Sequence, residues 1–141
     1  MSLSIVKQGG CSVTVLYDRM PEIAAKLPEL ADDVVRKTAF DIMADSQSRV
    51  HVKTGACKNS HYVVTSQGSG QGQALSDALS VNPRVKFAQM QPGAVGKCQA
   101  VVCVGVSYGT SLELRYPYLI PAFEAQMPAY RAALDSLVSR L

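Results

Sequence analysis

The sequence has no long hydrophobic run. Its 141 residues contain no apolar stretch near the roughly 20 residues that a membrane-spanning helix needs. Residues 1–7 also lack the charged and then apolar order that marks a secretory signal. These absences exclude the class of transmembrane proteins and predict a soluble protein of the cytoplasm.

Closely spaced cysteine pairs are also absent. The four cysteines, Cys11, Cys57, Cys98 and Cys103, include no C-x-x-C pair. Cys98 and Cys103 lie in a segment that we expect to be a strand, at an odd spacing, so their side chains would leave opposite faces and could not easily share one metal ion. We interpret all four as small core or surface residues in a reducing compartment.

A strong excess of one charge is missing as well. The 14 Lys and Arg side chains only slightly outnumber the 11 Asp and Glu side chains, so the net charge is +3. A nucleic-acid-binding domain usually carries a strongly basic patch or stripe. The sequence has no G-x-x-x-x-G-K-[ST] loop, and the alternating Gly68, Gly70 and Gly72 lack a strand-turn-helix context. The charge permits contact with a phosphate backbone without predicting it.

Few residues could carry chemistry. Cys57 lies between His51 and His61, which permits a cysteine–histidine nucleophile or a metal site to be drawn. A fourth ligand and an acid to orient a histidine are missing nearby, so both histidines are interpreted as surface or turn residues. Glu113 lies in an apolar, aromatic neighbourhood, where it is expected to pair with Arg115 or with a backbone amide. We predict no catalytic residues, no cofactor-binding residues and no metal ligands.

The sequence does contain strand patterns. Larger apolar residues alternate with smaller or more polar ones in three segments, 12–17, 60–65 and 84–88. The segment 98–106 is the most apolar stretch of the chain, and both of its faces are apolar. We therefore expect it to be a central strand that is covered on both sides.

Two long helices are predicted. A helix N-cap at Asp18 precedes a strong helical pattern over 28–49, whose first residue is a proline. The final helix starts within 117–121, and Pro128 inside it must either kink it or begin a second helix. Short helical segments are expected at 73–80 and 108–114.

Together these elements predict an α+β fold. We expect a mostly antiparallel sheet of about four strands, packed by the long helix of the N-terminal half and by the C-terminal helix. A single domain covers residues 1–141. Residues 66–73 consist only of Ser, Gly and Gln and are predicted to form a flexible loop.

Two helical faces could serve as contacts between copies. In the long helix, Phe40 and Met43 project opposite the apolar stripe that includes Val34 and Ile42. An aromatic residue on that face needs a covering surface, which can be a further layer of the core or another subunit. The final helix carries an apolar seam through Tyr130 that can serve as core or as a partner surface. The candidate interface residues are Phe40, Met43 and Tyr130.

Basic residues gather weakly at two places. Arg49, Lys53 and Lys58 surround the turn after the long helix, and Arg84 and Lys86 share one strand face. In a monomer they form a solvated surface. In a ring of copies they would form a positive band that meets DNA phosphates without reading the base sequence. The candidate DNA-facing or channel-facing residues are Lys53, Arg84 and Lys86.

Two segments resemble a known family. The long helix is followed by residues 50–60, Val-His-Val-Lys-Thr-Gly-Ala-Cys-Lys-Asn-Ser. This resembles the helix and the Pro-Val-Asp-Thr-Gly-x-Leu-Arg-x-Ser motif of the tail-completion, or head–tail joining, proteins of tailed bacteriophages. Residues 108–114 (Tyr-Gly-Thr-Ser-Leu-Glu-Leu) and 117–123 (Pro-Tyr-Leu-Ile-Pro-Ala-Phe) are similar to that family's Tyr-Ala-x-Tyr-x-Glu-Phe and Pro-Phe-Leu-x-Pro-Ala motifs.

The resemblance extends over about residues 21 to 141, and it implies a structural virion protein without catalytic residues. It implies a homo-oligomeric ring of six or more copies on the portal–tail axis, assembled in the host bacterial cytoplasm and located in the virion. The implied partners are neighbouring neck or tail proteins and passing DNA phosphates, without a membrane. His51, Lys53 and Cys57 replace the family's proline, acid and leucine. These departures leave open whether the chain is a tail terminator, a neck adaptor or a minor tail protein.

Two other classes of function remain open. The chain could be a small α+β module that binds nucleic acid without sequence specificity, which predicts DNA affinity that falls steeply with salt. It could also be a small cysteine-dependent or metal enzyme, which predicts loss of activity on replacement of Cys57 or on chelation.

Overall fold

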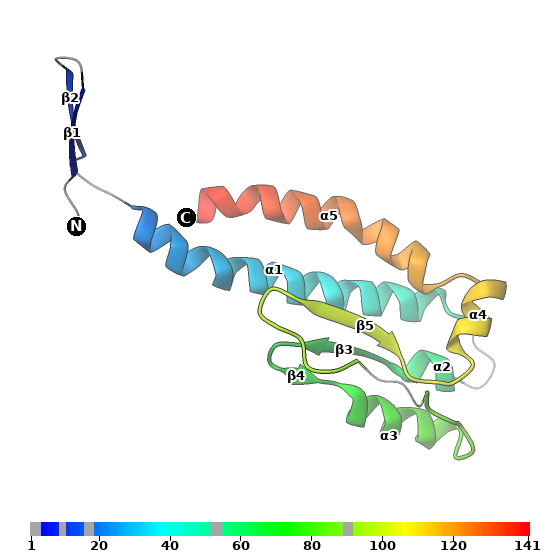
Figure 1. Cartoon of the computed structure of the whole chain (residues 1–141). Helices are drawn as coiled ribbons and strands as arrows, with labels where there is room; N and C mark the ends of the chain where they lie inside the picture. The colour runs from blue at the N-terminus through cyan, green and yellow to red at the C-terminus, as the bar shows by residue number, and fades with distance from the viewer. Residues whose placement is uncertain (1–3, 9–10, 16–18, 52–54, 89–91) are drawn as a thin grey trace.

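Two long helices, α1 (Met20–Arg49) and α5 (Leu119–Arg140), pack side by side and form the largest contact in the molecule (Figure 1). The structure, a computed structural model, describes residues 4–8, 11–15, 19–51, 55–88 and 92–141, the first two ranges as backbone. The main sheet has the strand order β4 (Gly68–Ser69), β3 (His61–Thr65), β5 (Ala100–Val104), with both pairings antiparallel. The remaining elements are the strands β1 (Ser4–Gln8) and β2 (Cys11–Val15), which pair with each other, and the short helices α2 (Ala56–Asn59), α3 (Gln71–Val81) and α4 (Gly109–Arg115).

The main sheet lies between helices. α1 packs on β3 and β5, and α3 packs on β3. Figure 1 shows α1 and α5 on one side of the sheet and α3 on the other. This arrangement confirms the predicted α+β class with two long helices and an antiparallel sheet. The core has one cluster around Val50, Cys57, Val106 and Tyr118 and a second around Tyr62, Val64 and Ala74.

Two of the four predicted strands are absent from the main sheet, which has three strands. The first, over 12–17, overlaps with β2, which pairs with β1 in a separate two-stranded sheet. The other is the segment 84–88. This segment meets the chain beyond β5 through a single antiparallel bridge between Phe87 and Val106. Gly105 permits this close contact, because a Cβ at that position would lie 2.2 Å from the Phe87 ring. The ring therefore packs over the backbone at a position that has no side chain.

The long helix begins at Met20, earlier than the helical pattern over 28–49 suggests. Pro21 stands in its first turn, where a missing backbone N–H costs nothing. Pro28 lies inside the helix and Pro128 lies inside α5, so neither proline starts a new helix. Each of these prolines removes one backbone hydrogen bond inside its helix, and the two helices that contain them pack against each other.

The central strand of the sheet is β3, and the prediction that 98–106 holds this place was wrong. All five residues of β3 are buried, whereas β5 is an edge strand of mostly intermediate exposure. His61 and Thr65 are polar residues of β3 that keep hydrogen-bond partners inside the core, so hydropathy alone ranks the two strands in the wrong order.

Two further expectations differ from the structure. The segment 66–73, expected as a flexible loop, contains β4 and the first turn of α3. Cys98, expected inside a strand, precedes β5 and has a φ of 62°, a value that few residues other than glycine adopt. A side chain of α1 holds its backbone in this conformation, as described below.

Candidate interaction surfaces

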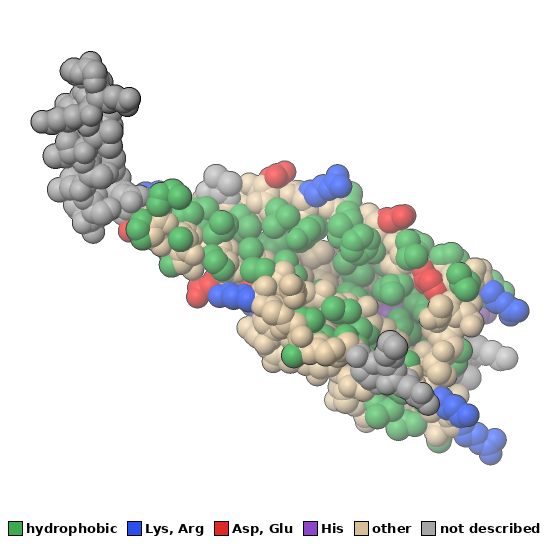
Figure 2. All heavy atoms as spheres, viewed as in Figure 1, with side chains coloured by type: hydrophobic (Ala, Val, Ile, Leu, Met, Phe, Trp, Pro, Cys, Tyr) green, Lys and Arg blue, Asp and Glu red, His purple; other side chains and the backbone are tan. Residues whose placement is uncertain are grey.

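An apolar groove, here called the α5 groove, runs between α1, α5 and β5. Its volume is about 500 Å³. Phe123 is 51% exposed, and Ile120 and Val101 are also exposed. Figure 2 shows hydrophobic side chains gathered along α5 and toward β5. Six of the lining residues are Val35, Ala39, Ile42, Val101, Phe123 and Tyr130.

A second groove, here called the α3 groove, lies between α1, the β3–β4 hairpin and α3. Its volume is about 560 Å³, and amide side chains and an arginine mix with apolar groups along it. Phe40, which is 50% exposed, and Met43 border it from α1. The predicted placement of these two residues away from the α1 stripe is confirmed, because Val34 and Ile42 on that stripe are buried.

The three predicted interface residues therefore lie in two different grooves. Phe40 and Met43 line the α3 groove, whereas Tyr130 lines the α5 groove. Of the three predicted DNA-facing residues, Arg84 and Lys86 are exposed, and Lys53 lies outside the described residues. Arg84 and Lys86 lie in the same segment, and neither of them lines the α5 groove or the α3 groove.

Sequence reasoning did not predict the α5 groove, although it named the seam of the last helix, through Tyr130, as core or as a partner surface. Ile120 and Phe123 belong to the apolar seam of the last helix, and Val101 belongs to the most apolar stretch of the chain. Residues of a core and residues of an unoccupied apolar groove follow the same helical and strand periodicities. The sequence thus contains no signal that distinguishes the two, and only the packing shows that these side chains are exposed.

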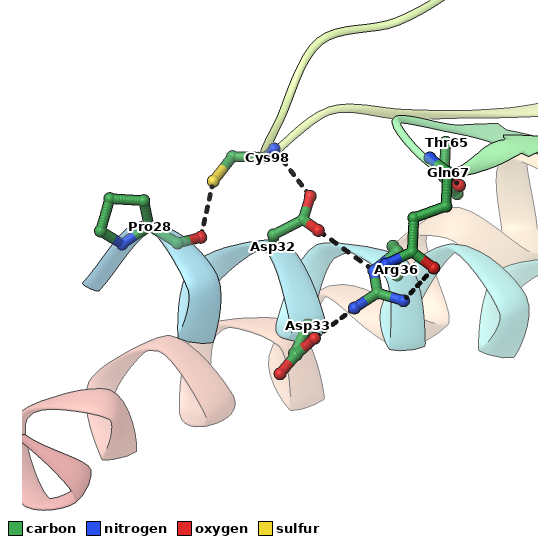
Figure 3. Close-up of polar contacts among 7 residues, drawn as sticks. All are labelled: Pro28, Asp32, Asp33, Arg36, Thr65, Gln67 and Cys98. Carbon is green, nitrogen blue, oxygen red and sulfur yellow. Dashed lines mark hydrogen bonds and ion pairs between the residues drawn. The ribbon is translucent and has the colours of Figure 1, made fainter. Parts of the chain in front are cut away.

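A polar network between the grooves fixes their walls (Figure 3). The buried Asp32 accepts a hydrogen bond from the Cys98 backbone N–H at 2.8 Å and another from Arg36 Nε at 3.2 Å. Arg36 also pairs with Asp33 and donates to Gln67 Oε1 at 3.0 Å. Asp32 thereby positions the start of β5 at the α5 groove, and Arg36 positions the β3–β4 turn at the α3 groove.

Part of this network can be predicted from the sequence. Asp32 and Arg36 have the i, i+4 spacing, and Asp33 and Arg36 the i, i+3 spacing, that bring opposite charges together on a helix. The contact of Asp32 with Cys98 joins positions far apart in the chain, and no local pattern predicts it.

Glu113 positions α5. Its carboxylate accepts hydrogen bonds from the backbone N–H groups of Tyr118, Leu119 and Ile120, at 2.9, 2.9 and 3.0 Å. These are donors at the start of α5, which have no partner within the helix. Burial favours the neutral carboxyl, but the three N–H groups outweigh it and hold the pKa of Glu113 below its ordinary value. Of the two predicted partners, the backbone amide is therefore the one that the structure shows.

Ser46 and His61 form a buried hydrogen-bonded pair. Ser46 Oγ lies 2.8 Å from His61 Nε2, and the two residues are 0% and 4% exposed. His61 Nδ1 faces the carbonyl oxygens of Cys57 and Lys58 at 2.9 and 3.1 Å, so Nδ1 carries the proton and Ser46 donates to Nε2. The prediction that His61 is a surface or turn residue was wrong. The pair has the distance of a nucleophile and its base, but Ser46 is closed to any substrate.

The candidate cysteine–histidine site does not assemble. Burial raises the pKa of the Cys57 thiol, which donates to Tyr118 Oη at 3.9 Å. The His51 ring stacks on Tyr116 with centroids 4.7 Å apart, away from His61 in the core. In the part of the chain that the structure describes, no three His, Cys, Asp or Glu side chains could hold a metal ion together.

No helix among the described residues combines the length and the apolar character that a membrane crossing requires. The sequence matches no family in a comparison with models of protein families, and neither the curated proteins nor the solved structures contain a match. The surfaces and buried sites above are therefore the basis for a functional proposal.

Proposed function

We propose that this chain is a non-enzymatic structural protein of a tailed bacteriophage, which forms a ring in the neck or at the end of the tail. The proposal joins the motif resemblance of residues 50–60 and 108–123 to the surfaces of the fold. The single observation that carries it is the presence of two open grooves with exposed aromatic or aliphatic side chains, on different sides of α1.

A ring requires two different contact surfaces on each copy. Closed rings form through head-to-tail contacts, in which one surface of a copy meets a different surface of the next. Val35, Ala39 and Ile42 border the α5 groove, whereas Phe40 and Met43 border the α3 groove. At about 100° per residue around a helix, these two sets point in different directions from α1. The grooves thus meet the requirement for two distinct surfaces.

The buried reactive groups favour a structural role over an enzymatic one. The Cys57 thiol and the Ser46 hydroxyl are both engaged in hydrogen bonds inside the core. Burial raises the pKa of the Cys57 thiol, so it stays in the weakly nucleophilic protonated form. In a ring, the exposed Arg84 and Lys86 of every copy would add positive charge that can contact DNA phosphates.

The deciding experiment is the oligomeric state of the purified chain. We expect multi-angle light scattering over a wide range of protein concentration to show a closed oligomer, and electron micrographs to show rings. Addition of neighbouring neck or tail components should promote assembly if the free chain is monomeric. A chain that stays monomeric under all these conditions, and that binds DNA with a steep salt dependence, would favour the nucleic-acid-binding alternative instead.

A further inference from the structure

The β1–β2 hairpin and the outer edge of β5 fit each other as partners. We propose that the hairpin of one copy pairs through its backbone with the edge of β5 in the next copy, and so supplies a fourth strand to the main sheet. The inference rests on the proposed function, because it takes for granted that copies associate, and it specifies which parts of the chain meet.

The direction of the backbone bonds in β3 shows that β5 has a free edge. The Val63 carbonyl accepts a hydrogen bond from Gly70 N–H at 3.1 Å, on the side of β4. Val63 pairs with Val102 across the β3–β5 ladder. In an antiparallel pair the residues either exchange both backbone bonds or direct both away from each other. Val102 therefore directs its N–H and C=O away from β3, at the outer edge.

At one end of this outer edge, beside the residues that follow β5, another segment already lies where a fourth strand would be. Beyond β5, Ala88 N–H donates to the Gly105 carbonyl at 2.7 Å, and Ser107 N–H donates to the Lys86 carbonyl at 2.8 Å. This edge thus accepts an antiparallel partner over a short stretch. The pairing stops at Gly105, and the five residues of β5 continue the same edge with no strand beside them among the described residues.

The β1–β2 hairpin would be stabilised by pairing with such an edge. Among the described residues, β1 and β2 pair only with each other, and each has five residues, the same length as β5. A two-stranded hairpin alone is at best marginally stable in water, and a third strand or a packing surface makes it stable. β2 has apolar residues at alternate positions, Cys11, Val13 and Val15. This pattern suits a strand with one apolar neighbour, which the α5 groove beside β5 provides.

The length of the chain favours a second copy as the source of the hairpin. The Cys98 backbone N–H donates a hydrogen bond to Asp32. Asp32 lies about 18 Å from Met20 along the axis of α1. Ala100, the first residue of β5, lies up to about 7 Å beyond Cys98. β5 leads away from Met20, because Val106 packs in one cluster with Val50 at the far end of α1.

The connection between the hairpin and α1 is short compared with that distance. From Val15 to Met20 the chain spans at most about 18 Å when fully extended. The two distances above add to at most about 25 Å along the helix axis, and the separation between the helix and the sheet comes in addition. The hairpin of the same chain could therefore reach the start of β5 only with this connection close to full extension, whereas the hairpin of a neighbouring copy has no such limit.

A proline at the outward-facing position of β5 tests the pairing. Val102→Pro removes only the N–H that points away from β3, and proline is tolerated at such an edge position. We expect the variant to keep the circular dichroism spectrum of the wild type and to weaken self-association at least about tenfold, as measured by sedimentation velocity. The matched control is Val101→Pro, which removes a bond to β3 and should lower the melting temperature.

Mixing two variants separates the two partners of the contact. Val13→Pro breaks the β1–β2 pairing and leaves the β5 edge intact, whereas Val102→Pro leaves the hairpin intact. Each variant alone should associate only weakly, and at a concentration where both are monomeric an equimolar mixture should form dimers that do not grow. Wild-type assembly should also slow the exchange of the Val102 amide hydrogen, a readout that needs no variant to fold.

The outcomes distinguish the inference from the proposed function. If the wild type forms rings, and Val102→Pro forms them equally well or the Val102 amide exchanges at an unchanged rate, the hairpin contact is wrong and the ring proposal stands. If the wild type never associates, alone or with neck and tail components, both are wrong.

Discussion

The carboxylate of Asp32 accepts a hydrogen bond of 2.8 Å from the backbone N–H of Cys98, a residue 66 positions later in the chain. This bond joins α1 to the residue that precedes β5 and holds that residue at a φ of 62°. One buried side chain thus determines where the edge strand begins relative to the long helix.

Replacement of Asp32 should loosen this junction. Asp32→Ala leaves the Cys98 amide without an acceptor and should lower the free energy of unfolding by about 1–3 kcal/mol, measured by urea denaturation. Asp33→Ala is the matched control. It removes an exposed partner of Arg36 and should change stability by less than about 0.5 kcal/mol. Equal losses in the two variants would show that the Cys98 contact contributes nothing.

Phe40→Asp should weaken self-association and leave the helical content intact. Phe40 is half-exposed at the α3 groove, so a charged side chain there costs the folded monomer little. The matched control is Leu114→Asp, which places the same charge at an 82% exposed leucine of α4, outside both grooves. Sedimentation velocity of the two variants measures the effect. Unchanged assembly of Phe40→Asp would exclude the α3 groove as a contact.

Glu113 should contribute stability that is lost in acid. Because its pKa is lowered on folding, the contribution is fully present above the ordinary value of 4.5 and decreases as the pH falls below it. Glu113→Gln keeps the size of the side chain and removes the charge, so it should lower stability at neutral pH by about 0.5–2 kcal/mol. Urea denaturation at several pH values checks this, and the difference between variant and wild type should shrink in acid. A difference that is constant with pH would contradict the account.

His61 should make the protein less stable below about pH 6.5. Burial lowers the pKa of His61 from 6.5. The carbonyl oxygens of Cys57 and Lys58 and the charge of Glu113 favour the protonated ring and partly oppose this effect. The unfolded chain then binds a proton that the folded chain does not, so stability is complete above 6.5 and falls as the pH drops toward the lower folded value. Denaturation at pH 7.5 and 5.5 measures the loss, and Glu113→Gln should retain it. Equal stability at the two pH values would disprove this role.

Gly105→Ala should be strongly destabilising. A Cβ there would lie 2.2 Å from the ring of Phe87, so the ring must leave its position over the backbone. A loss of about 1–3 kcal/mol is expected for such overpacking. Phe87→Ala alone removes the contacts of a partly buried ring, but in a Phe87→Ala background Gly105→Ala should cost little. Thermal denaturation of the single and double variants shows whether the effects are coupled, and additive losses would rule out the clash.

The sequence was sufficient to predict elements whose residues interact locally. The helices that became α1 and α5 follow from apolar positions at helical spacing, and β3 (His61–Thr65) follows from the alternating segment over 60–65. The start of α1 was misplaced because Pro28 suits the first turn of a helix, whereas in the structure it lies inside α1. The segment 84–88 was predicted from its alternation as a strand of the sheet, but it meets the chain beyond β5 through a single bridge, between Phe87 and Val106.

The candidate surfaces were predictable only in part. Phe40 was identified because it interrupts the polar side of an amphipathic helix, a signal that survives without tertiary information. Phe123 and Val101 follow the same patterns as core residues, so their exposure depends on how far α5 stands from β5. The Asp32–Cys98 bond joins two distant segments, and such contacts leave no periodic trace in a single sequence.

A single helix, α1, forms a wall of both grooves. In a circular assembly, the angle between the left and right contacts of each member determines how many members close the circle. If the two grooves are those contacts, the angle between the contacts is set by the rotation around the axis of α1 that separates residues such as Ala39 and Phe40. Substitutions that rotate or shift α1 would then change the diameter of the circle rather than merely weaken it.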